Sequence, residues 1–215
     1  MDDGTRGYDP QTMSRPRLIP VRTPDSPGGV VIALHGGASR GDQVSVSPTQ
    51  LSVLRMIPIA HRIARAGRSR LAVHRLLNSH RGWDTSTTPE ADARWAIEQV
   101  RDRHGDLPVA LVGHSLGGRA ALLAGDDPHV RCVVALNPWL LPTDRVDLRG
   151  RRVLVVHGTD DRIASPARSA DLVRRLPAGS DVEHVLIPGG KHAMLRHGRA
   201  FEEWATDFVV TTLLD

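Results

Sequence analysis

Cysteine, lysine and aromatic residues are all scarce in this sequence of 215 residues. The single cysteine, Cys132, excludes an internal disulfide and argues against a cysteine-rich metal site. No apolar run approaches the roughly 18 residues that a membrane span needs. Residues 1–30 also lack the hydrophobic stretch of a signal peptide. These absences predict a cytoplasmic protein without a membrane span.

The shortage of lysine explains a misleading isoelectric point. Lys191 is the only lysine among 28 basic side chains, and the formal net charge is only +4. Few groups therefore titrate between about pH 8 and pH 12, and a small positive excess moves the pI to 10.4. The arginines are scattered along the chain, and 3% aromatic residues offer little for base stacking. We expect no nucleic-acid partner.

Short apolar runs alternate with longer helical patterns along most of the chain. Residues 1–16 are polar and punctuated by Pro and Gly, which predicts a loose leader before a single domain over residues 17–215. The apolar runs predict strands buried on both faces. They lie at 30–35, 71–77, 109–112, 130–136, 153–157 and 182–187, with a shorter candidate at 17–23.

The segments between these runs have helical periodicity. They cover residues 50–66, 89–104, 116–124, 166–176 and 199–214. Thr88 is a candidate N-cap with Pro89 at the first helical position, and Pro58 is expected to kink or split the 50–66 helix. The alternation predicts an α/β fold, a mostly parallel central sheet with helices on both faces.

The sharpest motif, GHSLGG at residues 113–118, follows a predicted buried strand and opens a predicted helix. This is the context of a nucleophile elbow. Ser115 must occupy a tight, strained turn in which side chains two residues to either side would collide, so glycines are needed there. The turn also directs the Leu116 N–H to the place where an oxyanion would form.

With this motif, the chain from about residue 18 to its end resembles the α/β-hydrolase fold. Three further stretches carry the resemblance: HGGA at 35–38, HGTDD at 157–161 and GGKH at 189–192, each after a predicted strand. The resemblance implies that Gly37 or Ala38 supplies the second oxyanion N–H. It also implies that His192 is the catalytic histidine and that Asp161, in preference to Asp160, is the triad acid. The order Ser115, Asp161, His192 is the order that this fold uses.

The same resemblance indicates a site without a lid. Only about 15 residues join the strand ending near Leu136 to the next one, which leaves no room for a cap domain. Small carboxylesterases, acyl-thioesterases and dienelactone-hydrolase-like members share this open frame, although dienelactone hydrolases proper use Cys where this chain has Ser115. The candidates for lining a substrate pocket are His114, Trp139, Met194 and Trp83.

These residues imply a serine hydrolase that cleaves a carboxylic ester or thioester of a small molecule through an acyl-enzyme. Acyl transfer or cyclisation through the same intermediate is one alternative, and a catalytically inactive binding protein is another. No H-E-x-x-H pattern is present, and no carboxylate lies at ligand spacing from a histidine pair. We therefore expect no metal and no cofactor; the oligomeric state stays open.

Overall fold

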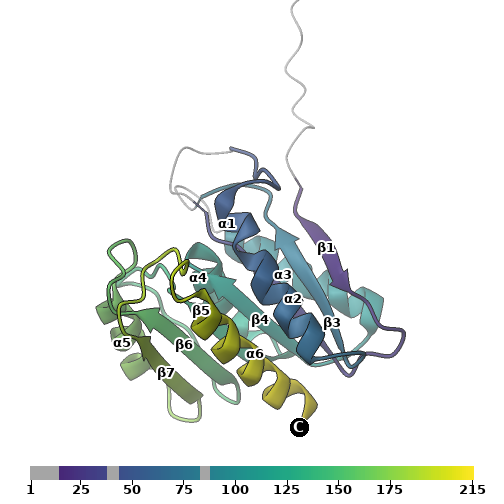
Figure 1. Ribbon diagram of the computed structural model, residues 1–215. Coiled ribbons are helices and arrows are strands. Elements are labelled where there is room, and N and C mark those ends of the chain that lie inside the picture. Colours follow the sequence, from purple (N-terminus) through teal and green to yellow (C-terminus); the bar gives the residue numbers. More distant parts are fainter. Residues whose placement is uncertain (1–14, 38–43, 83–87) are drawn as a thin grey trace, which may run out of the picture.

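The computed structural model describes residues 15–37, 44–82 and 88–215 (Figure 1). Strands and helices alternate along the chain as the apolar pattern predicts. In chain order they are β1 Arg17–Arg22, β2 Gly29–Leu34, α1 Leu51–Leu54, α2 Met56–Ala66, β3 Leu71–Leu77, α3 Thr88–His104, β4 Val109–His114, α4 Leu116–Leu123, a 3-10 turn at Ala124–Asp126, β5 Val130–Leu136, β6 Arg152–Gly158, α5 Pro166–Arg175, β7 Asp181–Ile187 and α6 Gly198–Leu214.

The strands form one seven-stranded sheet in the order β1-β3-β2-β4-β5-β6-β7. Only the edge strand β1 runs antiparallel to its neighbour, and every other pairing is parallel. Strands β2 and β4 are buried at every position, as parallel strands covered on both faces should be. The predicted fold class is confirmed.

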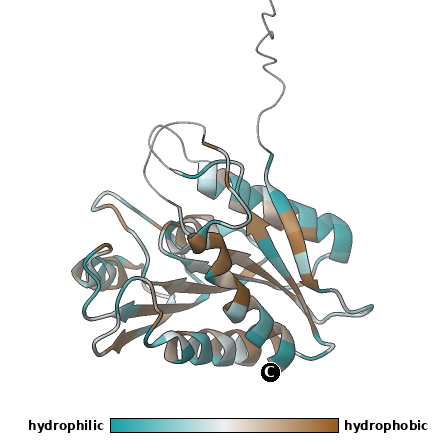
Figure 2. Ribbon diagram, turned by 45° about the horizontal axis from the view of Figure 1, so that its top comes forward, coloured by the Kyte–Doolittle hydropathy of each residue, from teal (hydrophilic) through white to brown (hydrophobic). Residues whose placement is uncertain are grey.

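Alternate residues of each central strand enter two separate cores. Val30 and Ile32 of β2 pack with α3, α4 and α5 on one face of the sheet. Val31 and Ala33 pack with α2 and α6 on the other, and Figure 1 shows these two helices side by side over the sheet. Apolar colour covers the strands in Figure 2, whereas the outer helix faces are largely hydrophilic. The sheet is therefore held from both sides, which fixes the positions of its strand ends.

The predicted 50–66 helix is split, but earlier than the sequence suggests. The break lies at Arg55, between α1 and α2, and not at Pro58. Pro58 sits in the first turn of α2, where a missing N–H removes no intrahelical hydrogen bond. The proline is therefore accommodated by a helix start just before it.

Residues 137–151 connect β5 to β6 directly, and no cap domain is present in the described chain. A buried ion pair fixes this connection to α4. Arg119 bonds both carboxylate oxygens of Asp144, at 2.7 to 3.1 Å, and Asp144 Oδ2 also accepts the Leu141 N–H. Sequence reasoning missed this pair because 25 residues separate its members.

Candidate active site

Ser115 stands in a strained turn between β4 and α4. Its φ is +57° and its ψ is −120°, a region that side chains rarely occupy and that costs about 1–3 kcal/mol. The two flanking glycines pass very close to each other: a Cβ on Gly113 would lie 2.1 Å from the Gly117 carbonyl oxygen. The structure therefore gives the physical reason for the glycine spacing, because only a bare backbone allows this approach.

The loop after β2 lies against this turn. A Cβ on Gly36 would be 3.1 Å from the Ser115 Cβ, and one on Gly37 would be 3.1 Å from Leu116 Cδ1. Leu116 is the first residue of α4, where backbone N–H groups have no intrahelical acceptor. The loop after β2 thus meets the serine turn, with Gly36 against Ser115 and Gly37 against the Leu116 side chain. Ala38, the other candidate for the oxyanion site, lies outside the described residues.

Three side chains from three strand ends meet in a hydrogen-bonded chain. His192 Nε2 lies 2.9 Å from Ser115 Oγ, and His192 Nδ1 lies 2.8 Å from Asp161 Oδ2. An ionised carboxylate only accepts, so His192 Nδ1 carries the hydrogen and Nε2 can accept the Ser115 proton. This is the arrangement in which an imidazole acts as a general base toward a hydroxyl.

Both oxygens of Asp161 are held by donors. Oδ1 accepts the Ile163 and Ala164 N–H groups at 2.8 and 2.9 Å, while Oδ2 faces both His192 and His157. Burial by itself raises the pKa of Asp161. The hydrogen bonds from His157, His192, Ala164 and Ile163 outweigh it and hold the pKa well below its usual range. Asp161 is therefore ionised at neutral pH.

The neighbouring Asp160 has a different environment. Its side chain is exposed, its carboxylate accepts a hydrogen bond from the Thr159 hydroxyl, and its backbone N–H donates to the Gly190 carbonyl. The structure therefore brings Asp161, and not Asp160, to His192.

Asn137 is a residue of the site that sequence reasoning did not identify. It follows β5 with a positive φ of 43° and is fully buried. Its Nδ2 donates to the Lys191 and His192 carbonyls at 3.2 and 3.3 Å, and its Oδ1 accepts the Gly158 N–H. Asn137 thus ties the histidine loop, residues 188–197 between β7 and α6, to the end of β6. A polar residue directly after a buried strand was the only signal in the sequence.

The four residues predicted to line a pocket occupy different environments in the structure. His114 is only 1% exposed, and its Nε2 donates to the His192 carbonyl at 2.8 Å. This bond ties its side chain to the loop that carries His192, and its burial leaves it little surface for a substrate. Trp139 is half-buried, with its N–H on the Ser115 carbonyl. Trp83 lies outside the described residues.

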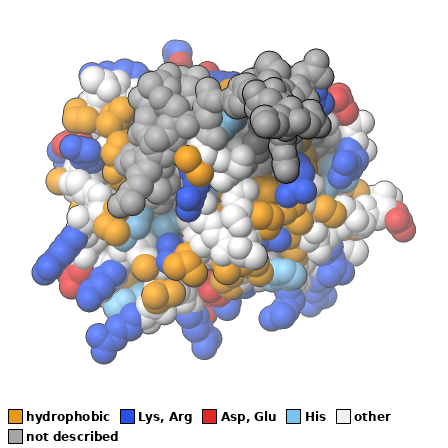
Figure 3. Space-filling view, turned by 90° about the horizontal axis from the view of Figure 1, so that it is seen from above, with side chains coloured by type: hydrophobic (Ala, Val, Ile, Leu, Met, Phe, Trp, Pro, Cys, Tyr) orange, Lys and Arg blue, Asp and Glu red, His pale blue; other side chains and the backbone are white. Residues whose placement is uncertain are grey.

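Met194 does line a groove, of about 340 Å³, beside the histidine loop. The groove lies between the start of α6, the α1–α2 junction and the residues after His192. Its apolar lining consists of Leu51, Leu54, Pro58, Ile59, Ala193, Met194 and Leu195, and Arg55 and Glu202 also line it. In the view from above, hydrophobic side chains spread across the middle of the face and Lys and Arg stand mostly around its margin (Figure 3).

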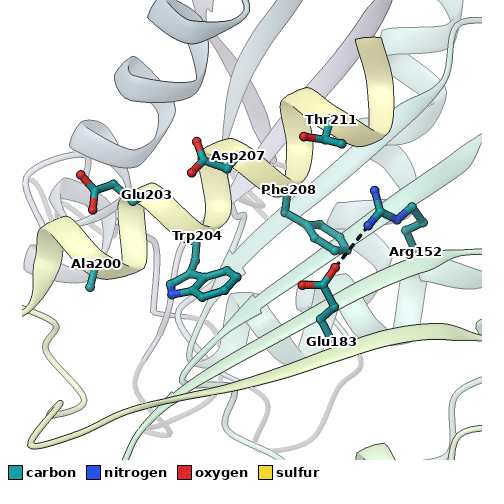
Figure 4. Close-up of a pocket in the computed structure, with 8 residues that line it drawn as sticks. All are labelled: Arg152, Glu183, Ala200, Glu203, Trp204, Asp207, Phe208 and Thr211. Carbon is teal, nitrogen blue, oxygen red and sulfur yellow. Dashed lines mark hydrogen bonds and ion pairs between the residues drawn. The ribbon is translucent and has the colours of Figure 1, made fainter. Parts of the chain in front are cut away.

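A second hollow, shown in Figure 4, is separate from this site. It lies between α6 and the β6–β7 edge, where Trp204 and Phe208 point toward Glu183 and Arg152. Arg152 pairs with Glu183 at 3.2 Å and stands 4.7 Å over the Phe208 ring. These groups satisfy each other, and none of the predicted site residues lines the hollow.

The described residues hold neither a candidate metal cluster nor a candidate membrane span. No group of three or more His, Cys, Asp or Glu side chains is placed to hold a metal ion. None of the described helices has the length and apolar character needed to cross a membrane.

The sheet order, the serine turn and the open connection after β5 define the α/β-hydrolase fold. Residues 74–152 match the family model described as alpha/beta hydrolase fold. Among curated proteins, a segment is similar to platelet-activating factor acetylhydrolase of Canis lupus familiaris. It is 39% identical over 54 residues, which are 25% of this chain and 12% of that protein. The chain thus matches only a small part of the length of this relative.

Solved structures of the same fold cover nearly the whole chain. An α/β serine hydrolase without a lid from Xanthomonas campestris aligns with a TM-score of 0.63 and 18% identity, over 93% of this chain and 89% of that one. Dienelactone hydrolase from Anabaena variabilis aligns with a TM-score of 0.64 and 18% identity, over 94% of this chain and 99% of that one. Est1E from Butyrivibrio proteoclasticus aligns with a TM-score of 0.64 and 15% identity, over 93% of this chain and 94% of that one. At these identities the likeness establishes the fold alone, which is the α/β-hydrolase fold.

Proposed function

We propose that this protein is a serine hydrolase that cleaves a carboxylic ester or thioester through an acyl-enzyme on Ser115. The observation that carries the proposal is the hydrogen-bonded chain from Ser115 Oγ through His192 to Asp161, at 2.9 and 2.8 Å. The strained serine turn and the ionised Asp161 agree with it.

In the proposed first half-reaction, Ser115 Oγ attacks the acyl carbon and its proton moves to His192 Nε2. The carbonyl oxygen becomes an oxyanion, and in this proposal the N–H groups of Leu116 and of Gly37 or Ala38 stabilise it. Asp161 keeps His192 in the required tautomer and stabilises the imidazolium. When the tetrahedral intermediate collapses, the leaving alcohol or thiol takes the proton from His192 Nε2.

In the second half-reaction, water attacks the acyl carbon and gives a proton to His192. The collapse of that intermediate releases the acid and returns the proton to Ser115 Oγ. If an amine or alcohol replaces water, the same steps give acyl transfer or cyclisation. We place the acyl chain in the groove beside Met194, because its lining is mostly apolar and includes Ala193, the residue directly after His192.

The experiment that tests the proposal is the intact mass of the protein after incubation with a fluorophosphonate. We expect a single adduct on the wild type and none on Ser115→Ala, because only an activated serine displaces fluoride from phosphorus. The matched control is Ser180→Ala, which removes a serine directly before β7, at the opposite end of the sheet from Ser115, and should leave one adduct. A folded wild type that forms no adduct would contradict the hydrolase and support the inactive binding protein.

A further inference from the structure

His157, at the end of β6, is a buried histidine to which the proposed mechanism gives no role. Its side chain is completely buried. Nε2 lies 3.3 Å from Asp161 Oδ2 and 3.2 Å from the Ala164 carbonyl oxygen, and Nδ1 lies 2.7 Å from the Ser169 hydroxyl. Both oxygens facing Nε2 are acceptors, so Nε2 carries a hydrogen and donates to them.

This donor completes the restraint on the Asp161 carboxylate. Oδ1 already receives two backbone N–H groups, so Oδ2 is the oxygen that must be kept directed at His192. His157 approaches Oδ2 from β6, and Ser169 on α5 holds the other side of the His157 ring. A carboxylate with donors on both oxygens cannot rotate without losing a buried hydrogen bond, which is costly in the interior.

A second histidine of the chain shows that this contact is not a general feature of a His-Gly strand end. His35 also precedes a glycine after a buried strand and is equally buried. Its two nitrogens, however, bond the Gly36 carbonyl and the Asn78 N–H. His35 therefore fixes backbone only, whereas His157 reaches a side chain of the proposed triad.

We infer that His157 is a positioning residue, which holds the Asp161 carboxylate in the orientation that receives His192. The inference rests on the proposed function. It also has an electrostatic consequence: the His157 donor withdraws negative charge from Asp161 Oδ2 and so moderates how strongly Asp161 stabilises a protonated His192. The other titratable groups facing this cluster are His114 from β4, His184 from β7 and Arg55 at the start of α2.

The test is the rate of fluorophosphonate labelling of Ser115 as a function of pH, in His157→Leu, His157→Gln and Ser169→Ala. In His157→Leu we expect labelling to be about 10- to 100-fold slower, since a small misplacement of a catalytic group has effects of this order. We also expect the acidic midpoint of the profile to move to higher pH. His157→Gln keeps an N–H donor and should restore most of the rate, and Ser169→Ala should lie between wild type and His157→Leu.

The control is His74→Leu, which removes an equally buried histidine on β3 that pairs with His104 of α3. Strands β2, β4 and β5 separate β3 from β6. Wild-type rate and midpoint in His157→Leu would overturn the inference. So would an equal loss in His74→Leu, or no rescue by His157→Gln. If the wild type does not label, the proposed function fails. The His192 Nδ1 proton resonance then still tests the positioning, because it should move in His157→Leu and stay in place in His74→Leu.

Discussion

Two adjacent aspartates show how strongly the environment of a single residue decides its chemistry. Asp161 is buried, accepts hydrogen bonds at both oxygens and contacts His192. Asp160 differs only by one position in the sequence, yet its side chain faces solvent. Their carboxyl groups are chemically identical, so any difference between them in catalysis arises from position.

Substituting each aspartate by asparagine tests this difference. Asp161→Asn should lower the labelling rate and turnover by about 10⁴-fold, because an amide in place of the carboxylate no longer enforces the His192 tautomer. Asp160→Asn is the matched control and should stay within about twofold of wild type, as exposed substitutions away from a site usually do. Comparable losses in both variants would contradict the assignment of Asp161.

At the scale of elements, the site is the meeting point of segments that follow four parallel strands. Ser115 follows β4, Asn137 follows β5, Asp161 follows β6 and His192 follows β7. Parallel strands bring their carboxyl ends to one edge of the sheet. The α1–α2 junction then adds the apolar groove beside this edge, which predicts a preference for acyl chains long enough to enter it.

Filling the groove should remove that preference. Leu54 lines it and is 40% exposed, so Leu54→Trp should fill the groove without disturbing the core. The ratio of kcat/KM for octanoyl over acetyl esters should fall about tenfold, the effect of losing contact with roughly two methylenes at about 0.8 kcal/mol each. The control is Leu186→Trp, because Leu186 is an exposed residue of β7 outside the groove. This variant should leave the ratio unchanged. An unchanged ratio in Leu54→Trp would place the acyl chain elsewhere.

At the scale of the whole molecule, the connection between β5 and β6 depends on a buried ion pair. Arg119 and Asp144 are 8% and 6% exposed, and they join α4 to residues 137–151. Removing one member of a buried ion pair typically costs about 3–5 kcal/mol.

Asp144→Ala should therefore lower the free energy of unfolding by about 3–5 kcal/mol, measured by urea denaturation. The double variant Arg119→Met with Asp144→Ala should recover much of that loss, since no charge remains buried. The exposed pair of Arg149 and Asp147 is the matched control, and Asp147→Ala should scarcely move the midpoint. A single variant as stable as wild type would contradict a stabilising role for this ion pair.

Local patterns in the sequence were sufficient for the fold and for the chemistry of the proposed site. Continuous apolar runs predicted β3 and β5 to the residue and the other strands to within one or two positions, because strands buried on both faces need apolar side chains throughout. The glycines around Ser115 predicted the tight turn, because only they permit its backbone approach. The division into a leader over residues 1–16 and one domain over 17–215 stays a prediction.

Contacts between distant segments were decided only by the tertiary structure. The roles of Asn137 and His157, the burial of His114 and the pair of Arg119 and Asp144 depend on partners brought together by the sheet. A polar residue at a strand end has the same local sequence signal whether it fixes a backbone, as His35 does, or holds a carboxylate, as His157 does. Local pattern specifies which segment becomes a strand or a turn, whereas the partner of a buried polar group is fixed by packing in three dimensions.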